Sequence, residues 1–319
     1  MLKPLQKPSH VYGPVPSRRL GLSLGIDIVP FKICTFNCVY CQLGKTIRQS
    51  GRRGHFFPVS EVLTQIRKAL DQNPKIDHIT FSGSGEPTLN TTIGKLIRQI
   101  KTMTDIPVAV LTNSSLLVRP SVRKALVAAD IVIPSLDAAR AASFRRINKP
   151  LPSLKIEGII RALVTFRREF KGRIWLEVML VKGINDSPAD IQALKKAIAR
   201  IKPDRIQLNT VVRPPAENWA KPLSRRALEM IKKDIGEKAE VVAEFRRRPR
   251  SPAGQNLRDA ILAMVERRPV TLPDITVSLG RNEREVRPHL DTLLRSKTIR
   301  RQRHRGSVYF APQNPRGNR

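Results

Sequence analysis

The chain has 319 residues, of which 40% are hydrophobic, so it can bury a large core and is excluded from the class of disordered proteins. Its formal net charge of +33 favours a polyanionic partner. No apolar run approaches the roughly 20 residues that a transmembrane helix needs. We therefore expect a cytoplasmic protein with no membrane span.

Short β-rich segments alternate with stretches of helical period over the first three quarters of the chain. The predicted strands are 22–29, 76–82, 107–112, 131–136, 174–181 and 205–212. Ser60 is expected to cap the first helix between them, and Ser187 with Asp190 is a predicted capping box for the fifth. Six such units predict an α/β fold, a partial (β/α)6 TIM-like barrel over residues 1–245.

All three cysteines of the chain lie within eight residues, as Cys34, Cys38 and Cys41. Thiolates are soft ligands that suit zinc, copper or iron–sulfur clusters. A four-iron cluster normally takes four cysteines, one per iron, so three cysteines would leave one iron open to a substrate or cofactor. Zinc with His55 as fourth ligand and unrelated buried thiols are the alternatives. The odd count and the lack of a secretory signal argue against disulfides.

The C-x3-C-x2-C spacing, with Tyr40 just before the last cysteine, resembles the signature of the radical S-adenosylmethionine (SAM) superfamily. The resemblance implies that the three thiolates hold a 4Fe-4S cluster whose open iron binds the amino and carboxylate groups of SAM. It further implies that an electron from the cluster, which an external donor reduces, cleaves SAM to methionine and a 5′-deoxyadenosyl radical, which takes hydrogen from a substrate. Tyr40 would then pack near the adenine, or simply cover the cluster.

In parallel β/α folds ligands bind at the carboxyl ends of the strands. The second predicted strand is followed by S-G-S-G-E-P, which resembles the GGE motif of the same superfamily with Ser84 in place of its first glycine. The resemblance implies that Gly85 and Glu86 meet the methionine ammonium of SAM. An ordinary glycine-rich turn is the alternative.

Polar residues at the later strands extend this set of cofactor candidates. Asn113, Ser135 and Asp137 lie at the ends of the third and fourth predicted strands. They are expected to hold a ribose and a carboxylate, or else to serve as helix caps and turn residues. Glu177 and Asn209 lie inside the fifth and sixth strands. There they either contact cofactor or substrate or make structural hydrogen bonds.

Basic residues near predicted strand ends or loops are the candidates for substrate contact, with solvated surface as the alternative; they are Arg18, Arg19, Arg146, Lys149 and Arg213. No acid–base pair or nucleophile is proposed, because the radical takes that role in this chemistry. Residues 11–21, together with the later Q-L-N-T-V-V-R-P-P, resemble a branch related to the tRNA wybutosine-synthesis enzymes. Those enzymes carry a second cluster for which no cysteines remain here, so their reaction is not expected.

The last quarter of the chain changes in composition. Residues 246–254 are basic and contain proline, which predicts a linker, and residues 312–319 are expected to form a flexible tail. Between them, residues 255–311 show three helical segments and then a β-hairpin, which resembles a winged helix. Capping boxes are predicted at Thr271 with Asp274 and at Asn282 with Glu285, and Pro288 is expected to kink the third helix.

From residue 246 onward, 18 Lys and Arg stand against 6 Asp and Glu, a net charge of +12. Such a surface attracts phosphates, which predicts contact with nucleic acid, tRNA or DNA. The candidate residues are Arg284, Arg287, Arg301, Arg303 and Arg305. A generally basic proteome, or a winged helix that docks a protein, would explain the same charge.

Two classes of function fit these patterns. The first is a radical SAM iron–sulfur enzyme, an oxidoreductase or transferase that acts on RNA, a peptide or a small metabolite. The second is an iron–sulfur redox-sensing regulator that binds nucleic acid. The β/α barrel and the Gly–Glu motif favour the enzyme, because a sensor needs neither.

Overall fold

The computed structural model describes residues 9–17, 19–72, 75–242 and 257–313. An eight-stranded sheet forms the larger unit, in the order β1-β2-β5-β6-β7-β8-β9-β10. Its strands are β1 (Val11–Ser17), β2 (Gly21–Ile26), β5 (His78–Phe81), β6 (Val108–Thr112), β7 (Ile131–Pro134), β8 (Arg173–Leu180), β9 (Arg205–Thr210) and β10 (Ala239–Val241). Neighbours from β2 to β10 are parallel, and β1 is antiparallel to β2. The six predicted strands and the α/β class are confirmed, and β1 and β10 are additional.

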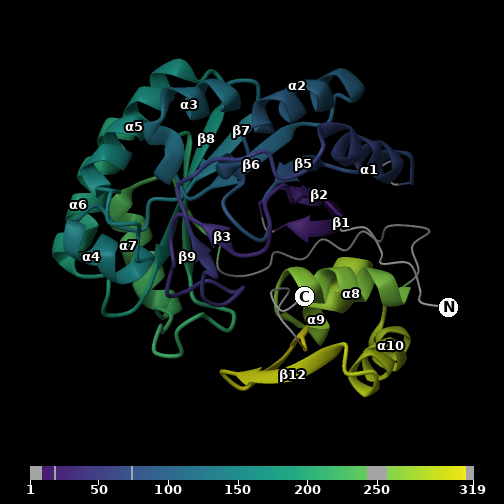
Figure 1. Cartoon of the computed structure of the whole chain (residues 1–319). Helices are drawn as coiled ribbons and strands as arrows, with labels where there is room; N and C mark the ends of the chain where they lie inside the picture. Colours follow the sequence, from purple (N-terminus) through teal and green to yellow (C-terminus); the bar gives the residue numbers. More distant parts are fainter. Residues whose placement is uncertain (1–8, 18, 73–74, 243–256, 314–319) are drawn as a thin grey trace.

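Helices cover the outer side of this curved sheet (Figure 1). They are α1 (Val59–Gln72), α2 (Ile93–Met103), α3 (Pro120–Leu126), α4 (Ala141–Asn148), α5 (Ile156–Glu169), α6 (Pro188–Ile201) and α7 (Arg225–Ile235). The predicted cap of α6 is confirmed, because the Ser187 side chain accepts a hydrogen bond from the Asp190 backbone. The cap predicted at Ser60 is wrong. Helix α1 already begins at Val59, and the carbonyl of Pro58 accepts the first helical bond, from Val62 N.

The core lies between the sheet and these helices. In α5, Ile156, Ile159, Leu163 and Phe166 recur at the spacing of one helical face and are buried. The strands beneath carry nearly continuous runs of buried apolar residues, as parallel strands covered on both faces do. Because the helices fix the strands from outside, the loops at the carboxyl ends of the strands are held in fixed positions around one mouth.

A smaller unit follows at residues 257–313, with its own core around Ile261, Ile275 and Leu290. Its elements are α8 (Leu257–Arg267), β11 (Val270–Thr271), α9 (Leu272–Leu279), α10 (Glu283–Arg295), β12 (Ile299–His304) and β13 (Ser307–Pro312). The three strands form an antiparallel sheet in the order β11-β13-β12. The three helices and the hairpin appear as predicted, and the winged-helix resemblance stays a prediction.

Local signals in this smaller unit agree with the structure. Both predicted capping boxes are present, at Thr271 and at Asn282, and Pro288 lies inside α10. The linker predicted at 246–254 lies outside the described residues, as does the predicted tail beyond residue 313. The division into domains at these boundaries stays a prediction.

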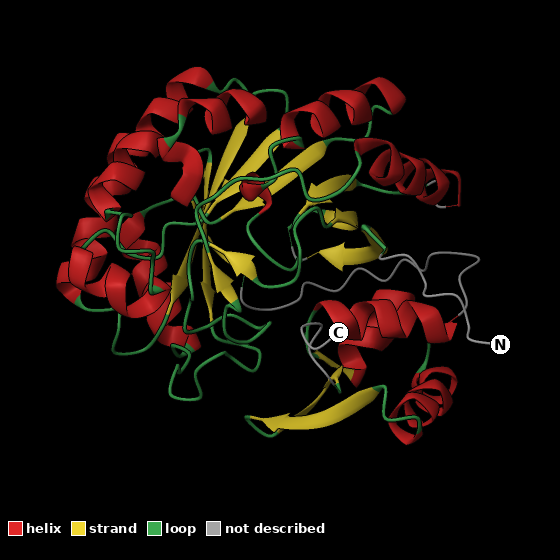
Figure 2. Ribbon diagram, in the orientation of Figure 1, coloured by secondary structure: helices red, strands yellow, loops and turns green. Residues whose placement is uncertain are grey.

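The two units pack against each other (Figure 2). Helices α8 and α9 contact β1, and Val15 of β1 packs against the core of the smaller unit. Tyr309 Oη donates a 2.8 Å hydrogen bond to the Val212 carbonyl, just beyond β9. These contacts bring α8 to the mouth of the barrel. Among the described residues, no helix combines the length and the apolar character that crossing a bilayer requires.

Candidate active site

The three cysteines lie on a loop fixed by backbone hydrogen bonds. Cys34 ends the short strand β3 (Ile33–Cys34), which pairs with β4 (Arg48–Gln49), and its carbonyl accepts from Ser50 N at 2.9 Å. The loop is tied to α4 by Val39 N, which donates to the Ile147 carbonyl at 3.0 Å. All three thiols are free and half-buried. The loop therefore holds three soft donors at the mouth of the barrel.

The surroundings of the sulfur atoms oppose ionisation of the free thiols. Burial, and then the nearby Glu86 carboxylate, raise the pKa of Cys34 to about 11. Burial and Asp137 raise the pKa of Cys38 well above its usual value. A metal ion supplies the positive charge that such buried thiolates need, so metal binding here would release protons.

A cavity of about 400 Å³ opens beside the cysteine loop and reaches the carboxyl ends of the parallel strands. Its wall contains several of the predicted site residues; they are Arg19, Cys34, Tyr40, Cys41, Gly85, Glu86, Asn113, Ser135, Glu177, Asn209 and Arg213. The smaller unit contributes Met264 and Arg268 to the same wall. Cys38, Ser84 and Asp137 stand behind the wall.

The glycine-rich turn after β5 packs tightly against the cysteine loop. A Cβ atom on Gly85 would lie 2.2 Å from the Ile33 carbonyl oxygen, so only glycine fits there. Ser84 points away from the cavity and donates to Asp27 Oδ2 at 2.6 Å. The turn and the loop therefore form one rigid edge of the cavity.

Glu86 is buried and caps the short helix η1 (Pro87–Leu89). Its Oε1 accepts from Thr88 N, Thr88 Oγ1 and Thr112 Oγ1 at 3.1, 2.6 and 2.7 Å, and its Oε2 accepts from Asn113 N at 2.7 Å. Burial raises the pKa of Glu86, and these hydrogen bonds oppose the rise. The carboxylate thus joins the ends of β5 and β6 at the cavity wall. Contact with a methionine ammonium stays a prediction.

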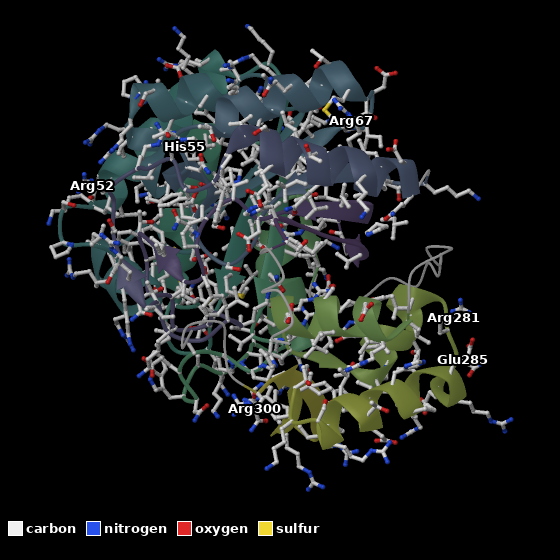
Figure 3. The ribbon with its side chains drawn as sticks, turned by 45° about the vertical axis from the view of Figure 1, so that its right-hand side comes forward. Arg52, His55, Arg67, Arg281, Glu285 and Arg300 are labelled. Atoms are coloured by element: carbon white, nitrogen blue, oxygen red, sulfur yellow. The ribbon has the colours of Figure 1, made fainter. Side chains whose placement is uncertain are left out.

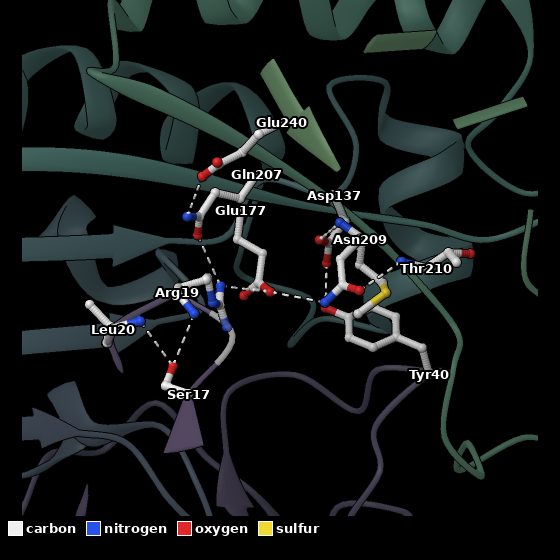
Figure 4. Close-up of polar contacts among 11 residues, drawn as sticks. Ser17, Arg19, Leu20, Tyr40, Asp137, Glu177, Gln207, Asn209, Thr210 and Glu240 are labelled. Carbon is white, nitrogen blue, oxygen red and sulfur yellow. Dashed lines mark hydrogen bonds and ion pairs between the residues drawn. The ribbon is translucent and has the colours of Figure 1, made fainter. Parts of the chain in front are cut away.

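Asp137 anchors Tyr40 on the opposite side (Figure 4). Its Oδ2 accepts from Tyr40 Oη at 2.5 Å and from Asn148 Nδ2 at 2.6 Å, and its Oδ1 accepts from Met179 N at 2.9 Å. Burial raises the pKa of Asp137 to about 6, although the bonds from Tyr40 and Asn148 lower it. Asp137 therefore orients the Tyr40 ring from behind the wall, and its predicted contact with the cofactor is indirect in this geometry.

A second polar group lies deeper in the barrel (Figure 4). Arg19 Nη1 pairs with Glu177 Oε1 at 2.9 Å and donates to Gln207 Oε1 at 3.2 Å. Asn209 Nδ2 donates to the same Glu177 oxygen at 3.4 Å. The structural hydrogen bonds of Glu177 and Asn209 are present, and both side chains line the cavity, whereas their contact with cofactor or substrate stays a prediction.

Other basic candidates are spread more widely. Arg146 Nη2 donates to the Gly183 carbonyl at 3.4 Å and Lys149 Nζ to Glu217 Oε1 at 2.7 Å, both outside the cavity wall. Arg213 lines the cavity and lies 3.9 Å from Asp274 of the smaller unit. Arg18 lies outside the described residues.

Arginines gather on the smaller unit away from this cavity. A groove of about 670 Å³ is lined by Arg287, Arg301 and Arg303, whereas Arg284 and Arg305 are exposed and do not line it. Carboxylates of the same unit pair with some of these side chains, as Glu283 does with Arg287 at 2.7 Å. Figure 3 shows Arg281, just before α10, next to Glu285 in the first turn of that helix, and Arg300 on the same unit. Arg281 Nη1 and Glu285 Oε1 form an ion pair at 3.1 Å.

Zinc receives no support from the geometry. His55 is exposed and does not line the cavity. Within the described ranges, no three His, Cys, Asp or Glu side chains converge as the ligands of one metal ion must. Sequence reasoning missed Lys32 and Asn148, which contact the cysteine sulfurs, and the cavity residues Met264 of α8 and Arg268 just after it.

Comparison with known proteins identifies the larger unit. Residues 28–211, more than half of the chain, match the family described as the radical SAM superfamily. A UPF0026 protein of Helicobacter pylori (strain J99) is 34% identical over 91% of this chain and 93% of its own length. The chain is 38% identical over 96% of its length to a protein named GTPase Obg from Brachyspira hyodysenteriae, and spans only 45% of that protein.

More distant matches include a named enzyme and a solved structure. A protein of Thermotoga sp. (strain RQ2), named a probable dual-specificity RNA methyltransferase RlmN, is 28% identical over 67% of this chain and 62% of its own length. The crystal structure of Streptococcus suis SuiB bound to S-adenosylmethionine matches with a TM-score of 0.52 and 17% identity, over 69% of this chain and 50% of that one. The latter likeness concerns the fold alone.

Proposed function

The chain belongs to the radical SAM superfamily, and we propose that it is an enzyme that uses a 4Fe-4S cluster to cleave SAM and start hydrogen abstraction from RNA. The observation that carries the proposal is the cavity that has Cys34 and Cys41 at one end and the strand-end residues along its wall. In this proposal the cluster, when bound, supplies the electron that cleaves the sulfonium of SAM, and an external donor restores it.

The residues present fit the cluster. Cys34, Cys38 and Cys41 supply three soft sulfur donors on one loop, which is one fewer than the four irons of such a cluster take. The buried Glu86 and the close approach of Gly85 to Ile33 hold the glycine-rich turn against that loop. A bound cluster would be held by these three thiolates, and its fourth iron would be left without a cysteine ligand.

The cavity fits one molecule of cofactor size. Tyr40, fixed by Asp137, offers a flat face at one side, and Asn113 and Ser135 offer polar atoms at the strand ends. These side chains orient the bound molecule, and Met264 of α8 adds an apolar side chain to the wall. None of them has to move a proton, because the radical performs the abstraction.

RNA is the proposed substrate for two reasons. The net charge of +33 and the arginine-lined groove suit a polyanion, whose binding releases counterions. A relative named as an RNA methyltransferase matches two thirds of the chain. We assign the groove with Arg287, Arg301 and Arg303, together with the exposed Arg284 and Arg305, to the RNA backbone.

The test is reductive cleavage of SAM. The full chain is reconstituted anaerobically with iron and sulfide, given SAM and dithionite, and assayed for 5′-deoxyadenosine by mass spectrometry. We expect product from the wild type and none from Cys38→Ala, and more product when substrate RNA from a deletion strain is added. Formation of 5′-deoxyadenosine by Cys38→Ala at the wild-type rate would contradict the assignment of the cluster. If no RNA fraction changes the rate of 5′-deoxyadenosine formation, the proposal that RNA is the substrate is wrong.

A further inference from the structure

Each cysteine sulfur of the loop receives one side-chain N–H donor, and the three donors come from different parts of the chain. Lys32 Nζ lies 3.2 Å from Cys41 Sγ, Asn113 Nδ2 lies 3.4 Å from Cys34 Sγ, and Asn148 Nδ2 lies 3.5 Å from Cys38 Sγ. Two of the donors are neutral amides. Lys32 alone among the three carries a charge, so its contact differs in kind from the others.

Lys32 is held in place by its backbone. Its N–H donates to the Ser84 carbonyl at 2.8 Å, and its carbonyl accepts from Ile47 N and Arg48 N at 3.1 and 3.2 Å. The residue adopts a left-handed backbone conformation with φ of 57°, which a non-glycine residue adopts only when its surroundings impose it. Lys32 is therefore fixed between the glycine-rich turn and the cysteine loop.

The ammonium group of Lys32 is also buried, since the residue is only 4% exposed. A buried ammonium costs free energy unless a negative group compensates it. Within the part of the chain that the structure describes, no carboxylate pairs with Lys32, and Cys41 Sγ is the polar partner of Nζ. A thiolate at Cys41, as in a bound cluster, supplies the missing negative charge.

We propose that Lys32 is a positioning residue that raises the reduction potential of the bound cluster through its charged hydrogen bond to Cys41. This inference rests on the proposed function. Hydrogen bonds to sulfur and the local charge are among the factors that set iron–sulfur potentials. Reduction adds negative charge to the cluster, so a fixed ammonium stabilises the reduced form more than the oxidised one. The enzyme thereby needs a less extreme electron donor.

The experiment compares reconstituted full-length variants in a redox titration followed by electron paramagnetic resonance. The substitutions are Lys32→Met, which removes charge and donor, and Lys32→Gln, which keeps a neutral donor. Lys45→Met is the matched control, because Lys45 is a nearby lysine whose side chain is 67% exposed and pairs with Glu217 at 3.8 Å. Iron content and thermal unfolding of the iron-free chains are measured in parallel.

At the wild-type midpoint, we expect the ratio of reduced to oxidised cluster to fall about tenfold in Lys32→Met, a shift of about 59 mV for one electron. The ratio should fall less in Lys32→Gln, and the ratio in Lys45→Met should equal that of the wild type. Unchanged ratios in fully loaded Lys32→Met and Lys32→Gln would overturn the proposal.

Folding and loading failures are distinguishable from failure of the inference. If Lys32→Met does not fold, the redox titration of Lys32→Gln tests the proposal in its place. A folded Lys32→Gln chain that binds no iron also overturns the inference, because Lys32 is assigned no part in coordination. A wild-type chain that binds no cluster refutes the proposed function itself, whereas a loaded cluster insensitive to Lys32 refutes only the tuning role.

Discussion

Replacing Gly85 with alanine should disrupt both the fold and the cysteine loop. The added Cβ would lie 2.2 Å from the Ile33 carbonyl oxygen, about 0.8 Å inside the shortest separation that real Cβ atoms show. Relieving this overlap costs about 1–3 kcal/mol as overpacking. The movement also breaks the 3.2 Å hydrogen bond from Glu86 N to the same carbonyl, at about 1 kcal/mol. We expect Gly85→Ala to lower the free energy of unfolding by about 2–4 kcal/mol.

Urea unfolding of the iron-free chain measures this loss, and iron content after reconstitution measures the displacement of Cys34. Gly158→Ala is the matched control. Gly158 lies within α5, and its new Cβ would meet only Arg161 Nη2, at 4.0 Å, so this substitution should stabilise the chain by about 0.5–1 kcal/mol. A Gly85→Ala chain with wild-type stability and iron content would refute the close packing of turn and loop.

Three further predictions concern charge and hydrogen bonding. Burial raises the pKa of Asp137 to about 6, so the folded chain keeps a proton that the unfolded chain releases above about pH 4. The free energy of unfolding, compared with that of Asp137→Asn, should therefore fall as the pH rises from about 4 to about 6 and then level off. Urea titrations over this pH range measure the change. Tyr40→Phe removes the 2.5 Å bond to Asp137 and should lower the free energy of unfolding by about 1–3 kcal/mol, and wild-type stability would show that this bond contributes nothing. Replacing Arg301 and Arg303 with glutamine should reduce the slope of log RNA affinity against log salt concentration by roughly 1 per lost phosphate contact. The control Arg67→Gln on α1 should leave this slope unchanged. Equal slopes in the groove variant and the wild type would argue against RNA binding in the groove.

The sequence predicted the fold where its signals are local and strong. Six strands appear within a few residues of their predicted bounds. Strands β6 and β7 are nearly continuous apolar runs, as buried parallel strands are, whereas β2 and β9 place apolar residues at alternate positions. Strand β1 escaped prediction because its V-Y-G-P-V-P-S contains two prolines and a glycine, which are tolerated only at a sheet edge. Strand β10 has three residues, too few for a periodic signal.

The parts of the candidate site that lie on one short segment were predictable from the sequence, and the contacts between distant segments were not. The cysteines and the Gly85–Glu86 turn belong to short motifs, and their joint presence at the cavity follows from the rule that strand ends meet. The contacts of Lys32 and Asn148 with sulfur depend on the path of the folded backbone, which no spacing rule gives. The docking of α8 beside β1 likewise depends on tertiary contacts between units that are far apart in sequence.

The packing of the smaller unit on β1 has a consequence for solubility. Strand β1 is an outermost strand of an open sheet, and α8 and α9 contact it. An uncovered outer strand offers unpaired backbone groups to a second chain and invites aggregation. A shortened chain that lacks residues 257–313 would bare this strand together with the apolar side chain of Val15. We therefore expect the shortened chain to self-associate more readily than the full chain.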